Sequence, residues 1–78
     1  PQGIRVNCIA PGFIETEMSS KALRDDPERM QKALSRTPMG TLGKPEDIAD
    51  AAWFFATDAS RFITGVVLPV DGGNSIGF

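Results

Sequence analysis

The chain has 78 residues and carries ten Asp and Glu against eight Lys and Arg, which gives a net charge of −2 at pH 7. This mild acidity argues against a nucleic-acid binder, because such a protein needs a basic surface to neutralise phosphates. No apolar run approaches the length of about 18 residues that a membrane-spanning helix needs, so we expect no membrane segment.

Two missing residue types restrict the chemistry: the sequence contains no His and no Tyr. His is the commonest general base and metal ligand, and only Tyr offers a phenolic proton donor. Since there is also only one Cys, we expect no metal site and no catalytic residue within the chain. The single Cys and the lack of a signal-peptide pattern indicate a cytoplasmic protein.

The first predicted element is a strand over residues 4–10. Alternate residues give it one apolar face: Ile4, Val6, Cys8 and Ala10. Ile9 adds apolar surface to the opposite face, which is typical of a strand covered on both sides in a parallel sheet. We expect Cys8 to be buried there as a small apolar residue rather than to act as a reactive thiol.

Pro11 and Gly12 are expected to end this strand, because Pro lacks an N–H group and Gly12 tolerates a positive φ. In open parallel sheets, ligands bind beyond the carboxyl ends of the strands. The residues just after this turn are therefore the best candidates for a site, with a plain strand-ending turn as the alternative.

Two short helices are predicted after the turn. Ser19 or Ser20 is expected to cap the first, over residues 21–25, and Asp26 with Pro27 favours the start of the second. The second helix has only a narrow apolar stripe, so we expect the pair to form a surface flap.

A third helix is predicted over residues 45–57, with Pro45 at its first position. It is apolar almost all round and is therefore expected to be buried on more than one side. Within this chain we find no second partner for its Trp53 and Phe54.

The second predicted strand runs from Val66 to Val70, and Pro69 within it indicates a position at the edge of a sheet. A right-handed crossover through the helices would make it parallel to the first strand. Stable parallel sheets need several strands with helices on both faces. The sequence therefore predicts an α/β fold of two parallel strands joined by helices, incomplete as a domain.

Residues 5–12, 43–49 and 63–73 resemble the short-chain dehydrogenase/reductase family in order and spacing, most closely its 3-oxoacyl-carrier-protein reductase and glucose or polyol dehydrogenase branch. The resemblance implies that residues 1–78 are the C-terminal segment of a single NAD(P)-binding, Rossmann-type domain that interconverts an alcohol and a ketone. It also implies that the family's phosphate-binding loop and catalytic Ser, Tyr and Lys precede these residues. The 78-residue chain alone is then expected to be inactive.

The same resemblance implies contacts with NAD or NADP just after the first strand. Pro11 and Gly12 would shape the nicotinamide pocket, and the backbone of Ile14 would hydrogen-bond the carboxamide. The Thr16 hydroxyl would contact the carboxamide or the pyrophosphate. The alternative for Thr16 is that it only caps the following helix.

The predicted flap resembles the family's variable substrate lid, in which Phe13 and Met18 are candidate contacts for an alcohol or ketone, with plain packing as the alternative. The resemblance also implies a homo-oligomer through Trp53, Phe54 and the strand from Val66 to Val70. A different class of function stays open: a truncated, non-catalytic module that docks on a full-length homologue.

Overall fold

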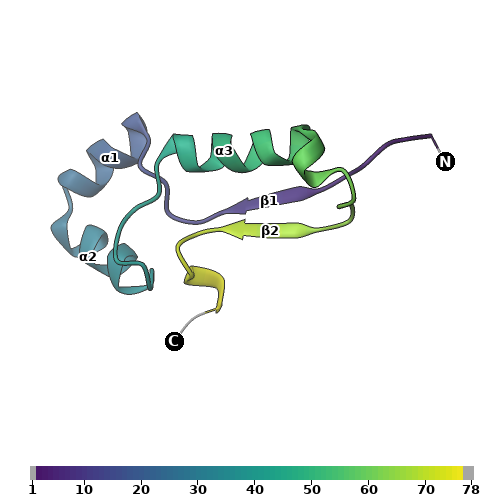
Figure 1. Ribbon diagram of the computed structural model, residues 1–78. Coiled ribbons are helices and arrows are strands. Elements are labelled where there is room, and N and C mark those ends of the chain that lie inside the picture. The colour runs from purple at the N-terminus through teal and green to yellow at the C-terminus, as the bar shows by residue number, and fades with distance from the viewer. Residues whose placement is uncertain (1, 77–78) are drawn as a thin grey trace.

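The computed structural model describes residues 2–76, apart from the side chain of Ser20. Its elements in chain order are β1 (Cys8–Pro11), α1 (Glu17–Arg24), α2 (Pro27–Ser35), α3 (Pro45–Ala56), the 3₁₀ turn η1 (Asp58–Ser60), β2 (Val67–Val70) and the 3₁₀ turn η2 (Asn74–Ile76). β1 and β2 pair in parallel, with Cys8 opposite Val67 and Pro11 opposite Val70. The predicted α/β arrangement of two parallel strands joined by helices is confirmed (Figure 1).

The elements form an elongated layer. α3 packs against both strands, and α1 and α2 lie beyond the carboxyl ends of the strands (Figure 1). The described chain extends 50 × 28 × 15 Å and has a radius of gyration of 15.0 Å. A compact domain of this length would have a radius of gyration of about 11.5 Å, so these elements do not close around a core of their own.

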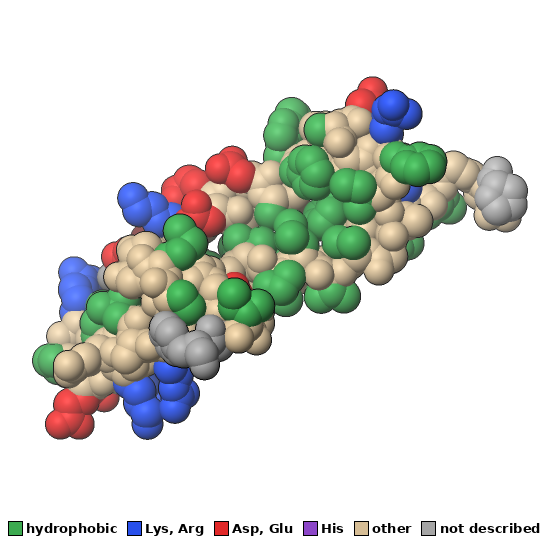
Figure 2. All heavy atoms as spheres, turned by 60° about the horizontal axis from the view of Figure 1, so that its bottom comes forward, with side chains coloured by type: hydrophobic (Ala, Val, Ile, Leu, Met, Phe, Trp, Pro, Cys, Tyr) green, Lys and Arg blue, Asp and Glu red, His purple; other side chains and the backbone are tan. Residues whose placement is uncertain are grey.

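Apolar side chains are largely exposed. Of the described apolar residues only Leu23 and Ala33 are buried, whereas Trp53 is 73% exposed. Figure 2 shows apolar side chains gathered over the middle of one face of the molecule. The prediction that Trp53 has no second partner within the chain agrees with this exposure. The prediction that Cys8 is buried is wrong for this chain, because no described element covers its side of β1.

β1 begins at Cys8, later than predicted, and Asn7 explains why. Its Oδ1 accepts a hydrogen bond from the Val66 N–H group at 3.0 Å, and its Nδ2 donates to the Ile63 carbonyl at 3.2 Å. Asn7 thus takes the Val66 N–H group out of the regular ladder, and the Val6 carbonyl accepts the Gly65 N–H group at 2.8 Å instead.

Pro69 lies in β2, one of the two strands of the described sheet. Its neighbour Val70 supplies the carbonyl that accepts the Gly12 N–H group at 3.1 Å. Because a parallel ladder uses alternate residues of a strand, the nitrogen of Pro69 faces away from β1 and no ladder bond is lost.

α1 begins earlier than predicted because Thr16, not Ser19, is its N-cap. Thr16 Oγ1 accepts the Ser19 N–H group at 3.1 Å and Ser19 Oγ accepts the Thr16 N–H group at 2.8 Å, which forms a capping box. Ser20 lies within the helix. The predicted starts of α2 and α3 are confirmed, with Asp26 as the N-cap of α2 and Pro45 as the first residue of α3.

None of the helices within residues 2–76 has both the length and the apolar character needed to cross a bilayer.

Candidate functional site

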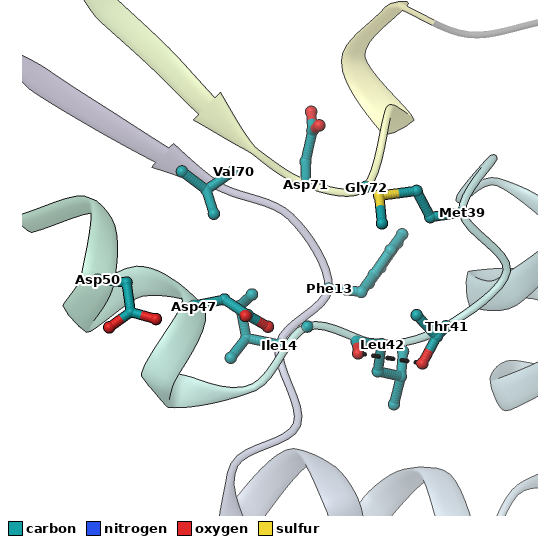
Figure 3. A pocket seen from close by; sticks show the side chains of 11 residues that line it. Phe13, Ile14, Met39, Thr41, Leu42, Asp47, Asp50, Val70, Asp71 and Gly72 are labelled. Atoms are coloured by element: carbon teal, nitrogen blue, oxygen red, sulfur yellow. Dashed lines mark hydrogen bonds between the residues drawn. The ribbon is translucent and has the colours of Figure 1, made fainter. Parts of the chain in front are cut away.

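Three segments meet at the carboxyl ends of the strands: those that follow β1, follow β2 and precede α3 (Figure 3). The Met39 N–H group donates to the Gly72 carbonyl at 3.0 Å, and the Gly43 N–H group donates to the Phe13 carbonyl at 2.9 Å. The loop before α3 is therefore bound to both strand ends and holds them in place.

These segments border a hollow of about 300 Å³, which Phe13 and Ile14 line from one side and Asp47 and Asp50 of α3 from another (Figure 3). Asp47 is engaged in the start of α3, because its Oδ2 accepts the Lys44 N–H group at 2.7 Å. Within residues 2–76 no group of three or more His, Cys, Asp or Glu side chains is arranged to hold a metal ion.

The main chain of Ile14 has unusual hydrogen-bonding geometry. Ile14 pairs with Gly43 in an isolated parallel bridge, formed by Glu15 N–H to Gly43 carbonyl (2.7 Å) and Gly43 N–H to Phe13 carbonyl (2.9 Å). In such a bridge Ile14 contributes neither its own N–H nor its own C=O, so both groups point away from Gly43. The carbonyl accepts the Ser19 hydroxyl at 2.7 Å. Ile14 thus presents a donor and an acceptor on the same side of the chain, beyond the end of β1.

Thr16 is held by Ser19. Besides capping α1, its hydroxyl donates to Ser19 Oγ at 3.0 Å. The capping role, which was the alternative to a cofactor contact, is therefore present in the structure. A hydroxyl has one proton and two lone pairs, so Thr16 can donate to a ligand only if its proton turns away from Ser19.

Gly12 is required for a reason other than the predicted one. Its φ is not positive, so left-handed freedom is not what the turn needs. A Cβ atom at Gly12 would lie 2.5 Å from the Cβ of Asp71, so the close approach of the two strand ends leaves no room for a side chain. Pro11, opposite Val70, is the last residue of β1.

Asp71 closes the turn after β2. Its carboxylate accepts the Gly73 N–H group at 3.0 Å and the Ser75 N–H group at 2.9 Å. Hydrogen bonds from the side chain and the backbone of Ser75 hold the pKa of Asp71 below its ordinary value.

The two candidate substrate residues lie in different surroundings. Phe13 is 40% exposed and lines both the hollow of Figure 3 and a second hollow between α1 and α2. Met18, on α1, is 84% exposed and lines neither of them.

Ser19 was not among the predicted site residues, yet its hydroxyl contacts both Ile14 and Thr16. The signal in the sequence is the Thr-x-x-Ser spacing, a variant of the capping box in which Ser replaces the usual Glu or Gln.

Known proteins resemble this chain along almost its whole length. The family described as enoyl-(acyl carrier protein) reductase matches residues 1–75. Galactitol 2-dehydrogenase (L-tagatose-forming) from Cereibacter sphaeroides is 47% identical over 75 residues, which cover 96% of this chain and 29% of that protein. A 3-oxoacyl-[acyl-carrier-protein] reductase from Chlamydia trachomatis is 54% identical over 72 residues, which cover 92% of this chain and 28% of that protein.

The fold is shared with solved structures as well. A protein from Agrobacterium tumefaciens assigned as a 2-deoxy-D-gluconate 3-dehydrogenase, solved with bound NADP, superposes with a TM-score of 0.87 at 47% identity. The match covers 95% of this chain and 30% of that one. The chain thus spans less than a third of the length of the relatives it matches. Since the family match extends over residues 1–75, the chain belongs to the short-chain dehydrogenase/reductase family, and the predicted Rossmann-type α/β fold is confirmed.

Proposed function

We propose that this chain is the C-terminal portion of a single NAD(P)-binding domain, in an oxidoreductase that interconverts an alcohol and a ketone. Family membership supports the reaction class, and the bound NADP of the Agrobacterium protein supports NAD or NADP as the cofactor. The observation that carries the proposal is the main chain of Ile14, with its N–H and C=O groups turned away from Gly43 beyond the end of β1.

The groups of Ile14 fit a nicotinamide carboxamide. The carboxamide offers one acceptor oxygen and an NH₂ group, which match the Ile14 N–H and C=O groups respectively. The carbonyl oxygen has two lone pairs and can accept from the carboxamide and from Ser19 together. The bound cofactor would give or take the hydride, and Ile14 would fix which face of the ring meets the substrate.

The neighbouring residues would complete the cofactor contacts. Pro11 and Gly12 form the wall beside the nicotinamide, and the close approach of Asp71 leaves no room for a side chain at Gly12. Thr16 contacts the carboxamide or the pyrophosphate while it holds the start of α1.

α1 and α2 form the substrate lid over the carboxyl ends of the strands. Phe13 lines both hollows, which supports a contact with an alcohol or ketone. For Met18 the support is weaker, namely its exposed position on α1, since it lines neither hollow. The Ser, Tyr and Lys of the family's catalytic step would come from residues before Pro1.

Exposed apolar side chains support an interface as well. Trp53 is 73% exposed and Phe54 38%, and Val66 and Val67 are exposed beside β1. We infer that this surface joins copies of the parent enzyme into a homo-oligomer. The same surface favours the second candidate function, a non-catalytic module that docks on a full-length homologue. Size-exclusion chromatography with and without an intact relative separates the two, because only the module would elute with that relative.

The test of the reaction compares the 78-residue chain with the product of its complete reading frame. Both are assayed for NADH and NADPH oxidation with a 3-oxoacyl thioester and with L-tagatose, the chemistries named for the two relatives. We expect the longer protein to bind NAD(P)H and the short chain to be inactive. Ketone-dependent oxidation by the short chain would overturn the proposed division of roles, and a longer protein that binds neither cofactor would overturn the proposal.

A further inference from the structure

A hollow of about 370 Å³ lies between α1 and α2, within the size range of small-molecule sites. Part of its lining is apolar: Phe13, Ala22, Leu23 and Ala33. Leu23 and Ala33 are the buried apolar residues of the described chain, so the best-packed part of this structure forms the wall of the hollow.

The other part of the lining is cationic. Arg29, Lys32 and Arg36 line the hollow at the spacing i, i+3 and i+7, which places them along one face of α2 and its carboxyl end. Residues 29–36 contain these three cations and no acid, whereas the whole chain has a net charge of −2. Figure 2 shows Lys and Arg side chains around the end of the molecule where α1 and α2 lie.

Among the residues that the structure describes, these three cations have no anionic partner. Asp25 and Glu28 each precede one of them by four residues, a spacing that often gives an ion pair on a helix. Within residues 2–76, however, none of the three cations forms an ion pair. Like charges gathered at a partly enclosed apolar surface repel one another, and an anion placed among them relieves that repulsion and is held more strongly than in open water.

We propose that this hollow binds an organic anion, namely a carboxylate or phosphate group carried on a small apolar body. Ser19 lines the hollow and its hydroxyl contacts the Ile14 carbonyl, so the hollow adjoins the proposed cofactor site. The inference rests on the proposed function in one respect, which is that it identifies the bound anion with the substrate. The substrate would then be an alcohol or ketone that also carries an acid group.

The test is calorimetric titration of the product of the complete reading frame, without cofactor. Hexanoate and hexyl phosphate are the probes, and 1-hexanol is the uncharged control. We expect hexanol to bind at least about tenfold more weakly than whichever of the two anions binds more tightly. The anion that binds more tightly shows whether the hollow takes a carboxylate or a phosphate. Replacing Lys32→Gln and Arg36→Gln together is expected to weaken anion binding about tenfold or more. The matched pair Lys21→Gln and Arg61→Gln removes the same charges outside the hollow and is expected to leave binding unchanged.

A second variant tests whether binding needs the space in the hollow as well as its positive charge. Ala22→Leu puts three more carbons into the hollow without changing any charge, and we expect it to weaken anion binding while the far-UV circular dichroism spectrum is retained. Equal binding of hexanol and both anions, or unchanged binding in either set of variants, overturns the inference. Binding of poly-L-glutamate with no binding of the small anions also overturns it, because the cations would then serve an acidic protein partner.

The outcome is independent of the proposed reaction. Absence of anion binding in a protein that still oxidises NAD(P)H overturns this inference alone. Anion binding in a protein that binds neither cofactor overturns the proposed function alone and leaves the hollow as an anion site.

Discussion

Ser60 joins the carboxyl end of α3 to the segment before β1, and its replacement by Ala measures how much this junction stabilises the fold. Ser60 is fully buried, at 0% exposed. Its hydroxyl donates to the Phe54 carbonyl at 2.7 Å and accepts from Arg5 Nη1 at 3.1 Å. A hydrogen bond to a charged donor contributes about 1.5–3 kcal/mol and a neutral one about 0.5–1.5 kcal/mol.

Both partners of Ser60 keep other bonds after the substitution, which lowers the expected loss. Arg5 still donates to the Ile63 carbonyl, and the Phe54 carbonyl still accepts from the Thr57 hydroxyl. We therefore take the lower end of each range and expect Ser60→Ala to reduce the free energy of unfolding by about 2 kcal/mol.

In the product of the complete reading frame, urea unfolding measures this loss as a lower midpoint with an unchanged slope. Ser35→Ala is the matched control, because Ser35 is exposed and its hydroxyl donates only to the Lys32 carbonyl, at 2.7 Å. We expect the control to stay within about 0.5 kcal/mol of the parent. If Ser60→Ala loses no more than the control, the reasoning about this junction is refuted.

Gly12→Ala is expected to lower the free energy of unfolding by about 1–3 kcal/mol, because the new Cβ would lie 2.5 Å from the Cβ of Asp71. In Gly43→Ala the new Cβ would come too close to one atom, Cδ1 at the flexible end of the Ile14 side chain, at 2.6 Å. Thermal unfolding should therefore rank Gly43→Ala as the milder change, and the reverse order would contradict the close approach at Gly12. Because folding lowers the pKa of Asp71, its ionised form stabilises the folded state above the unfolded pKa, and this contribution is lost as the pH falls below about 4. The free energy of unfolding, measured with urea, should therefore fall more steeply between about pH 6 and pH 2.5 for the parent than for Asp71→Asn. Parallel curves would argue against a stabilising role of the Asp71 carboxylate.

Local signals predicted the starts of two helices correctly. Asp26 followed by Pro27 starts α2, and Pro45 starts α3, because an N-cap side chain and a fixed φ act within one turn of the chain. The parallel pairing also followed from the order of strand, helix and strand.

The errors lie where a distant partner decides the structure. β1 starts only at Cys8 because the side chain of Asn7 bonds to residues near β2, which no local pattern reveals. The exposure of Cys8 likewise depends on what covers β1, not on the alternation within it. Gly12 is confined by Asp71, 59 positions along the chain, and not by its own φ.

The candidate site was predicted in part. The end of β1 was the expected place, and the bridge between Ile14 and Gly43 lies there. Ser19 was missed because its role depends on Thr16 as the N-cap. The cations of α2 are visible in the sequence, but only the packing of α1 against α2 places them beside an apolar hollow.

The backbone amide of Ile14 tests the central claim most directly. In ¹H–¹⁵N spectra of the product of the complete reading frame, we predict a saturable shift of the Ile14 amide signal when NADH or NADPH is added. ADP-ribose, which lacks the nicotinamide, should leave this signal in place. Saturable binding of NAD(P)H without a shift at Ile14, or an equal shift with ADP-ribose, would contradict the proposal that this chain holds the nicotinamide.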